Sequence, residues 1–329
     1  MTKSNGEIKR LGRKFQNGQE PTGEDLEILL DWAKFFATPM QAFYSDLCSI
    51  FSAEGIKSSC RVKRLESILC KNLRIKAENQ LSTMGDVAGI RIIAKDMAHL
   101  KSLRKELERR LAPGSFIGPD FDVASCKVKD YIESPSLLGY RSVHFRLSLI
   151  EKAAGKRFRL ELQLRTLREH AWAQAVETVG AVRGIDFKHN PPDGFFKALG
   201  DVLAVREGSV STSLEKEAIC RARELDGLSG YSKDLAEFKG SRFQTVSFEG
   251  SSGRWHVFET DAGKWKKSCE RFEDLPLAWE SYRRKALANP GCLLVFTQDS
   301  GYVSNLYRAY NPSEDVGIFD EILEIAGAN

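Results

Sequence analysis

The chain has 329 residues, ordinary apolar and charged fractions and a formal net charge of +4. The length suffices for two domains, whereas so small a charge does not predict a general nucleic-acid-binding protein. The sequence shows no signal peptide, no apolar run near the roughly 18 residues of a membrane span and no Cys-x-x-Cys pair. We therefore expect a cytoplasmic protein with reduced thiols, no zinc site and no membrane contact.

The N-terminal part is expected to be helical after a loose start. Residues 1–22 are polar and contain several glycines, so we expect little order there. Residues 22–25 can begin a helix, which Pro39 is expected to break before a second helix follows. Residues 61–75 then predict a basic helical stretch.

A buried strand and a hairpin are predicted next. Residues 87–94 are rich in isoleucine and predict the strand, and Asp96 is expected to cap the helix that follows. Residues 142–149 and 157–166 alternate between apolar and polar residues, which is typical of two strands of an antiparallel hairpin. Such a polar face is also typical of a solvated sheet surface. Its residues include His144, Arg146, Glu161 and Gln163.

The C-terminal part begins with a linker around residues 190–194. Helices are expected at about 195–206, 214–226, 231–239, 275–288 and 315–326, and strands at 243–248, 255–260 and 292–297. Because the composition changes near Arg242 and catalytic signatures are absent beyond it, we expect a separate regulatory or oligomerisation domain. His256 and Cys292 are expected to be packing residues there.

Two carboxylates and a basic segment predict a site for a nucleoside polyphosphate. Asp86 precedes the buried strand, and Glu161 lies on the polar face of the hairpin, so the two could share one Mg²⁺ with phosphate oxygens. Lys71 and Arg74 would share one face of a helix and could contact phosphates. No glycine-rich phosphate loop is present, so side chains must bind the phosphates.

Six segments in a fixed order resemble the synthetase domain of the RelA/SpoT alarmone synthetases, over about residues 40 to 185. They are Arg61-x-Lys63-x-x-x-Ser67-Ile68-x-x-Lys71, Gly85-Asp86-Val87-Ala88-Gly89-Ile90-Arg91, Asp130-Tyr131-Ile132-x-x-Pro135, Gly139-Tyr140-Arg141-Ser142-Val143-His144, Glu161-Leu162-Gln163-Leu164-Arg165-Thr166 and His170-Ala171-Trp172-Ala173. The paired His-Asp motifs of the hydrolase domain found in long members are not visible. The chain thus resembles a stand-alone synthetase.

The resemblance implies Mg²⁺-dependent transfer of the β,γ-pyrophosphate of ATP to the ribose 3′-hydroxyl of GDP or GTP, which yields (p)ppGpp and AMP. It implies the following roles. The Mg²⁺ ligands are Asp86 and Glu161, and Glu161 also takes the hydroxyl proton. The ATP contacts are Arg61 and Arg91 around adenine, with Lys63, Ser67, Lys71 and Arg74 at the phosphates. The acceptor contacts are Tyr140, as a stacking platform, with His144 and Gln163.

The resemblance also implies the fold class and the domains. We expect an α+β protein with a mixed sheet flanked by helices and a small C-terminal α+β domain. The predicted division is an N-terminal segment and helix at 1–40, the synthetase domain at 41–190, a helical connector at 191–240 and the C-terminal domain at 241–329. Stand-alone relatives are often oligomers, so a homo-oligomer is also expected.

One loop departs from the family, whose members usually have Pro-Lys-x-Asn-Gly-Tyr where this chain has Pro135-Ser136-Leu137-Leu138-Gly139-Tyr140. The missing lysine and asparagine help to bind the acceptor, so its identity stays open. Other basic groups that could supply the lost contacts are Lys127, Lys129, Arg141 and Arg146. The alternatives are a toxic enzyme that pyrophosphorylates the 3′ end of tRNA or makes adenosine analogues, and a non-catalytic nucleotide-binding regulator.

Overall fold

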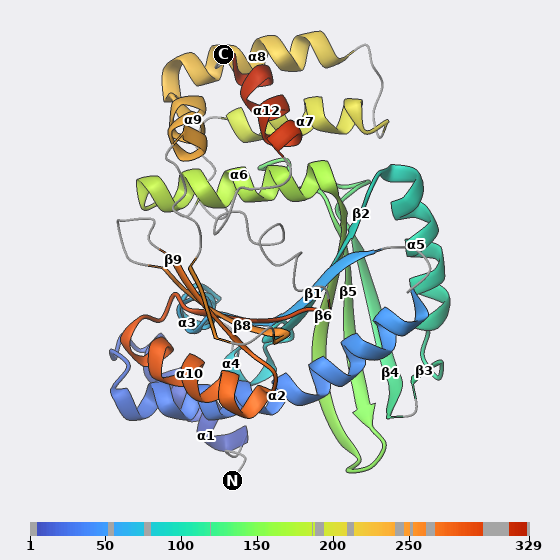
Figure 1. Ribbon diagram of the computed structural model, residues 1–329, viewed down its shortest axis with the longest axis vertical. Coiled ribbons are helices and arrows are strands. Elements are labelled where there is room, and N and C mark those ends of the chain that lie inside the picture. The colour runs from blue at the N-terminus through green and yellow to red at the C-terminus, as the bar shows by residue number, and fades with distance from the viewer. Residues whose placement is uncertain are drawn as a thin grey trace.

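The structure is a computed structural model, and it shows a mixed ten-stranded sheet flanked by helices, which confirms the predicted α+β class (Figure 1). None of the helices in the described part of the chain has the length and apolar character needed to cross a membrane. The described residues are 5–51, 56–75, 80–118, 120–185, 187, 194–208, 214–240, 247–250, 253–260, 267–298 and 316–327.

The strands of the described residues lie in the order β3-β4-β5-β6-β2-β1-β10-β8-β9-β7, so strands from both halves of the chain share one sheet. Most neighbours are antiparallel, but β2 and β6 run parallel, as do β7 and β9. The strands are β1 (Lys57–Val62), β2 (Ala88–Ala94), β3 (Phe116–Gly118), β4 (Phe121–Asp130), β5 (Val143–Glu151), β6 (Lys156–Thr166), β7 (Ser247–Gly250), β8 (Trp255–Thr260), β9 (Lys267–Phe272) and β10 (Leu293–Phe296).

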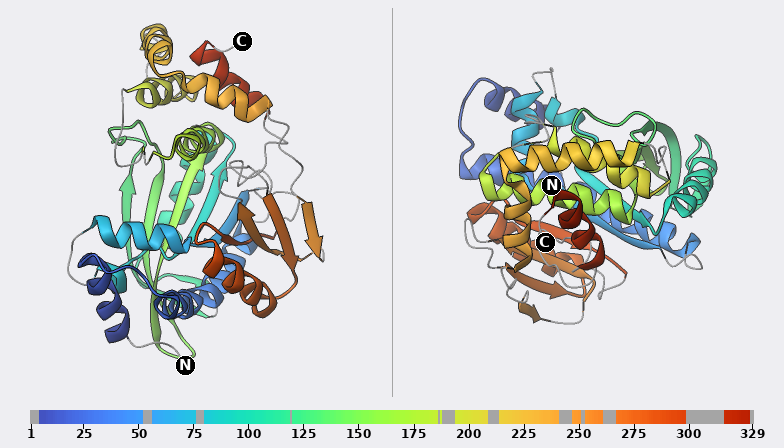
Figure 2. Two further views of the ribbon diagram at one scale, coloured as in Figure 1. Left: turned by 90° about the vertical axis from the view of Figure 1, so that its left-hand side faces the viewer. Right: turned by 90° about the horizontal axis from the view of Figure 1, so that it is seen from above.

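The helices form two groups, each with its own apolar cluster. The group packed with the sheet is α1 (Asn5–Gln16), α2 (Gly23–Ile50), α3 (Leu65–Arg74), α4 (Gln80–Thr83), α5 (Met97–Arg110) and α10 (Leu275–Ala288). The other group is α6 (Leu167–Arg183), α7 (Phe195–Arg206), α8 (Glu215–Ser229), α9 (Tyr231–Gly240) and α12 (Val316–Ala326). In Figures 1 and 2, α6 lies across one end of the sheet and the other four form a layer beyond it.

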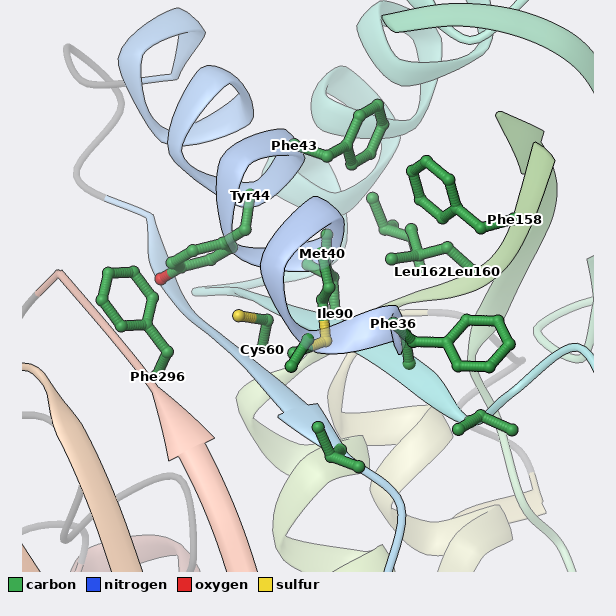
Figure 3. Close-up of a cluster of buried hydrophobic side chains, with 14 of the residues drawn as sticks. Phe36, Met40, Phe43, Tyr44, Cys60, Ile90, Phe158, Leu160, Leu162 and Phe296 are labelled. Carbon is green, nitrogen blue, oxygen red and sulfur yellow. The ribbon is translucent and has the colours of Figure 1, made fainter. Parts of the chain in front are cut away.

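The main core forms where α2 packs across the apolar face of the sheet (Figure 3). The helix contributes large side chains, and four neighbouring strands supply the opposing surface. The labelled residues are Phe36, Met40, Phe43 and Tyr44 of α2, Cys60 of β1, Ile90 of β2, Phe158, Leu160 and Leu162 of β6, and Phe296 of β10. All of them are less than a tenth exposed, so this core fixes the sheet on the side opposite to its polar face.

The predicted hairpin is confirmed as β5 and β6, which pair antiparallel. The apolar residues predicted for the inner face of β6 are all buried, from Phe158 to Leu164. Their burial fixes the register, because a slip by one residue would turn the whole apolar set towards solvent. The opposite face therefore carries the polar residues.

Three predictions for the N-terminal half are wrong. Residues 5–16 form α1, because Ile8, Leu11 and Phe15 make a buried stripe at helical spacing. Helix α2 continues through Pro39, since the apolar contacts of a long buried helix outweigh one lost backbone hydrogen bond. The basic stretch at 61–75 begins as the end of β1 and becomes helical at Leu65.

The predicted separate domain at residues 241–329 also needs correction. Strand β10 pairs with β1, and Phe296 and Trp255 belong to the same apolar core as α2. Helix α12 instead packs with α6 to α9. The C-terminal strands therefore complete the sheet, and strand β9 was missed altogether. The predicted linker at 190–193 and the first part of the strand at 243–248 lie outside the described residues.

Trp255→Ala tests whether the C-terminal strands share one core with the rest of the sheet. Trp255 is fully buried, and its ring centroid lies 4.9 Å from that of Phe296. We expect the free energy of unfolding in urea to fall by about 3–5 kcal/mol, in a single transition for the whole sheet. Leu277→Ala on the exposed side of α10 is the control and should change little. A separate early transition for Trp255→Ala alone would contradict a shared core.

Candidate active site

The polar face of the sheet carries its side chains in two rows that cross the strands. In one row, Lys127 of β4 lies opposite Arg146 of β5, which lies opposite Glu161 of β6. The pairing continues from Glu161 to Gly89 of β2 and from there to Arg61 of β1. Paired residues in a sheet point to the same face, so this register brings residues from five strands into one surface.

The second row lies two residues further along each strand. Lys129 of β4 is opposite His144 of β5, which is opposite Gln163 of β6, and Gln163 is beside Arg91 of β2. The predicted continuous polar face of the hairpin is thus present. The structure also brings Arg61 and Arg91 to this face, although both precede the hairpin by many residues in the sequence.

Asp86 is the carboxylate that pairs with two lysines of the basic segment. Its Oδ2 accepts hydrogen bonds from the ammonium groups of Lys63 and Lys71, both at 2.7 Å. Burial raises the pKa of Asp86, but the two ammonium groups outweigh burial and hold it well below its usual range. Its Oδ1 is buried and has no hydrogen-bond partner, so one acceptor oxygen is available for a cation.

Helix α3 supplies the other predicted phosphate contacts. Ser67, Lys71 and Arg74 are four and three residues apart, so they lie on one side of this helix. Lys63 comes directly after β1, where its backbone N–H donates to Val87 O at 2.8 Å. This bond ties the start of the basic segment to the residue that follows Asp86.

Glu161 has two different oxygens. Oε1 accepts from Gln163 Nε2 at 2.8 Å and lies 3.4 Å from His144 Nδ1, whereas Oε2 lies 3.7 Å from Arg146 Nε. Burial raises the pKa of Glu161, but the contacts with His144 and Gln163 outweigh it and lower this pKa to about 2. The charge of Asp86 acts in the opposite direction and raises this pKa.

Arg61 and Arg91 lie diagonally across β1 and β2, with Gly89 between them on the same face. A Cβ at Gly89 would be at ordinary contact distance, 3.8 Å from Glu161 O, so backbone packing does not require a glycine there. No side chain stands at position 89 in the row that Arg61 shares with Glu161. That arrangement suits a flat ring.

Tyr140 sits at the other end of the polar face, in the loop before β5. Its hydroxyl lies 2.8 Å from His144 Nε2 and accepts from Arg165 Nη2 at 3.1 Å. The guanidinium of Arg165 lies over the ring, 5.4 Å from its centroid, and Tyr131 makes an edge contact at 5.5 Å. The ring also packs against Trp172, with ring centroids 6.2 Å apart, so Tyr140 joins the polar face to the second apolar cluster.

The loop that departs from the family packs against α7. Leu138 is 7% exposed and belongs to the apolar cluster of the second helical group. Gly139 has φ of +93°, and a Cβ there would come within 3.0 Å of Lys197 Cα. Arg141 is buried and paired with Asp201 of α7 at 3.1 Å. The helical layer therefore holds this loop directly.

The donor set suits a hard cation such as Mg²⁺, because it consists of carboxylate oxygens. Among the described residues, no group of three or more His, Cys, Asp or Glu side chains is placed to bind a metal by itself. A cation at Asp86 and Glu161 would therefore also need oxygens from water or from phosphates.

The sequence analysis missed Arg165 and Tyr131 as site residues. Arg165 follows Gln163 by two positions on β6, so the alternation of the strand already places it on the polar face. Tyr131 directly follows β4, and its contacts with Tyr140 and His144 depend on how the loop folds back. Only the first of these positions could have been found from sequence spacing.

The low pKa of Glu161 predicts a pH-dependent contribution to stability. A carboxyl group whose pKa falls from 4.5 to about 2 on folding stabilises the protein above pH 4.5, and this stabilisation is lost as the pH falls towards 2. We expect Glu161→Gln to lower the free energy of unfolding at pH 7 by on the order of 3 kcal/mol. The difference from the wild type should vanish near pH 2.

Urea unfolding at a series of pH values measures this difference. The same substitution at the exposed Glu133 is the control and should follow the wild-type curve. An equal loss of stability in Glu161→Gln at pH 2 and pH 7 would contradict the assignment.

Part of the chain is similar to known proteins. Residues 60–180 match the family model described as "Region found in RelA / SpoT proteins". An uncharacterized protein from Mycobacterium tuberculosis is 30% identical over 193 residues, which cover 57% of this chain and 63% of that protein. GTP pyrophosphokinase YwaC from Bacillus subtilis is 29% identical over 119 residues, which cover 34% of this chain and 52% of the enzyme. The chain thus spans less than two thirds of these relatives.

Solved structures also match. Small alarmone synthetase 1 from Bacillus subtilis, bound to its product pppGpp, is 22% identical with a TM-score of 0.38, covering 60% of this chain and 96% of that one. A GTP pyrophosphokinase family protein from Streptococcus pneumoniae is 20% identical with a TM-score of 0.41, covering 57% and 96%. The match to the family model runs from β1 into α6 and includes every predicted site residue, so residues 60–180 resemble the region found in RelA/SpoT proteins.

Proposed function

We propose that this chain is a cytoplasmic pyrophosphotransferase that acts alone or as a homo-oligomer. It moves the β,γ-pyrophosphate of ATP to the ribose 3′-hydroxyl of GDP or GTP and releases AMP. The observation that carries the proposal is that Asp86, with its two lysines, and Glu161 on the polar face both lie in the region that matches the RelA/SpoT family model. Basic groups for phosphates lie on one side of this pair and an aromatic platform lies on the other.

The donor half of the site would bind ATP. Adenine fits between Arg61 and Arg91, where Gly89 leaves space. The triphosphate would extend towards Lys63 and α3, whose Ser67, Lys71 and Arg74 offer donors. Phosphate oxygens could then replace Asp86 as partners of Lys63 and Lys71, because each ammonium group has three donors.

Mg²⁺ bound by Asp86, Glu161 and phosphate oxygens would neutralise charge on the transferred group. In the transfer, the 3′-oxygen forms a bond to the β-phosphorus, and the bond from that phosphorus to the oxygen of AMP breaks. Glu161 is a weak base because its pKa is about 2. It would therefore orient the hydroxyl and accept its proton late, once the new O–P bond has made that proton acidic.

The acceptor half would hold GDP or GTP with its base on Tyr140. Loop residues 136–138 offer little to its phosphates, since Ser136 Oγ accepts from Tyr140 N at 3.1 Å and Leu138 is buried. Arg141 is buried against α7, where its Nη2 donates to Asp201. The acceptor phosphates are therefore assigned to the basic side chains of the outer strands, which are exposed beside Glu161. These are Lys127, Lys129 and Arg146.

A polyanionic acceptor such as the 3′ end of tRNA is the second candidate. The same exposed side chains on β4 and β5 could contact several phosphates, and such binding would be strongly salt-dependent. An adenosine nucleotide as acceptor, or nucleotide binding without transfer, would use the same surfaces. The acceptor assay separates these outcomes.

The first functional prediction concerns the reaction itself. Purified protein with γ-³²P-labelled ATP and Mg²⁺ is given GDP, GTP, ATP or bulk tRNA in parallel. Label should appear in guanosine nucleotides, with an equal amount of AMP released. Glu161→Gln should lower the rate by roughly 10²-fold or more, the scale for loss of one transition-state contact.

Glu133→Gln is the matched control, because it makes the same change at an exposed loop position. Label in tRNA alone would make the protein a translation-blocking enzyme instead. Nucleotide binding without any AMP release would indicate a non-catalytic nucleotide-binding regulator. Wild-type activity in Glu161→Gln would show that Glu161 has no part in the mechanism.

The second functional prediction separates the two halves of the site. Gly89→Val fills the space between Arg61 and Arg91 at a position where a Cβ meets no close contact. It should weaken ATP binding at least tenfold and leave GDP binding within about twofold. Tyr140→Ala should do the reverse. Calorimetric titration in the Glu161→Gln background measures both affinities without turnover, and equal effects on both nucleotides would contradict the division.

A further inference from the structure

Five polar side chains of the site form a closed ring of contacts. Arg165 Nη2 donates to Gln163 Oε1 at 2.6 Å and to the Tyr140 hydroxyl at 3.1 Å. Gln163 Nε2 in turn donates to Glu161 Oε1 at 2.8 Å. On the other side, the Tyr140 hydroxyl lies 2.8 Å from His144 Nε2, and His144 Nδ1 lies 3.4 Å from the same Glu161 oxygen.

The chemistry of the end members fixes the direction of the two bonds through Gln163, whereas the direction of the Tyr140–His144 bond depends on the tautomer of His144. A guanidinium only donates and an ionised carboxylate only accepts. Gln163 must therefore receive at Oε1 and donate from Nε2. The Tyr140 hydroxyl receives from Arg165 and can donate its own proton to His144 Nε2. The ring requires this arrangement, in which a neutral His144 carries its proton on Nδ1, 3.4 Å from Glu161 Oε1.

Two donor chains thus start at one guanidinium and end at one carboxylate oxygen. Arg165 is 3% exposed and Glu161 is 9% exposed, so both charges are removed from water and the two chains connect them. Removing Arg165 would leave Gln163 and Tyr140 without the partner that orients them. Oε2 of Glu161 takes no part in the ring and lies 3.7 Å from Arg146 Nε, on the exposed side of the carboxylate.

We infer that Arg165 is a positioning residue that fixes the distance between Tyr140 and Glu161. The inference rests on the proposed function, in which Tyr140 stacks the acceptor base and Glu161 holds the 3′-hydroxyl. Both groups are oriented by the same guanidinium before the substrate arrives. The ring therefore selects acceptors in which the base and the 3′-hydroxyl belong to the same nucleoside, because this sets the distance between the two groups.

Kinetics with acceptor variants test this role. Arg165→Met should lower kcat/KM for the acceptor by roughly ten- to a hundredfold, as is usual for residues that orient a reacting group, and leave the KM for ATP within about twofold. Arg165→Lys keeps the charge and one donor contact, so it should recover part of the loss. The matched control is Arg157→Met, at an exposed position of the same strand. An equal rise in both KM values would overturn the inference.

A double-mutant cycle shows whether the effect passes through the ring. Tyr140→Phe removes only the hydroxyl that joins Arg165 to His144. In that background, Arg165→Met should cost clearly less than it does in the wild type, because one chain is already broken. Independent, additive losses would overturn the inference. If Arg165→Met does not fold, Arg165→Lys takes its place in the same cycle.

The proton position on His144 tests the ring without any turnover. Long-range ¹H–¹⁵N NMR of the wild type at pH 8, with the signal assigned by its loss in His144→Asn, should show the Nδ1–H tautomer. The Nε2–H tautomer would overturn the ring even if the enzyme is active. An Nδ1–H tautomer in a protein that transfers no pyrophosphate would support the ring and refute the proposed function.

Discussion

The parallel pairing of β2 with β6 is the contact on which the site depends. It places Glu161 beside Gly89 and Gln163 beside Arg91, so it joins the basic first half of the domain to the hairpin. Apolar residues on the opposite face of both strands hold this register against α2. If β6 slipped by one residue, Glu161 would point into the apolar core. The strand pairing that folds the sheet therefore also assembles the site.

The site is built from charges that are already paired. Asp86 is neutralised by two lysines, and Glu161 is connected to Arg165 through two donor chains. Buried charges need such partners, because the desolvation of an isolated ion costs several kcal/mol. In the proposed reaction these pairs also have a second use. The lysines can exchange the carboxylate for ATP phosphates, and the carboxylate then becomes available to a cation.

The sequence was sufficient for the hairpin, the strand at β2 and the class of the fold, because alternation and buried apolar runs report directly on a sheet. It failed where tertiary packing overrides local signals. Pro39 was expected to end a helix that the core in fact continues. Strand β1 is short and polar in composition, and the place of β10 beside β1 depends on contacts over more than 200 residues of chain. The site residues could be named from motifs, but their two cross-strand rows and the ring through Arg165 required the register.

The altered acceptor loop is explained by the helical layer. Leu138 stands where the resemblance leads one to expect an asparagine, and it is buried in the cluster of α6 and α7. An amide there would lose its polar partners on burial, whereas leucine gains apolar contacts. Gly139 lets the loop approach α7 to within backbone contact, and the pair of Arg141 with Asp201 closes the same junction. Leu138 thus packs inside the chain, next to α7, and offers no polar group to a ligand. The position of Tyr140, and with it any acceptor stacked on this ring, consequently depends on a helix that lies outside residues 60–180.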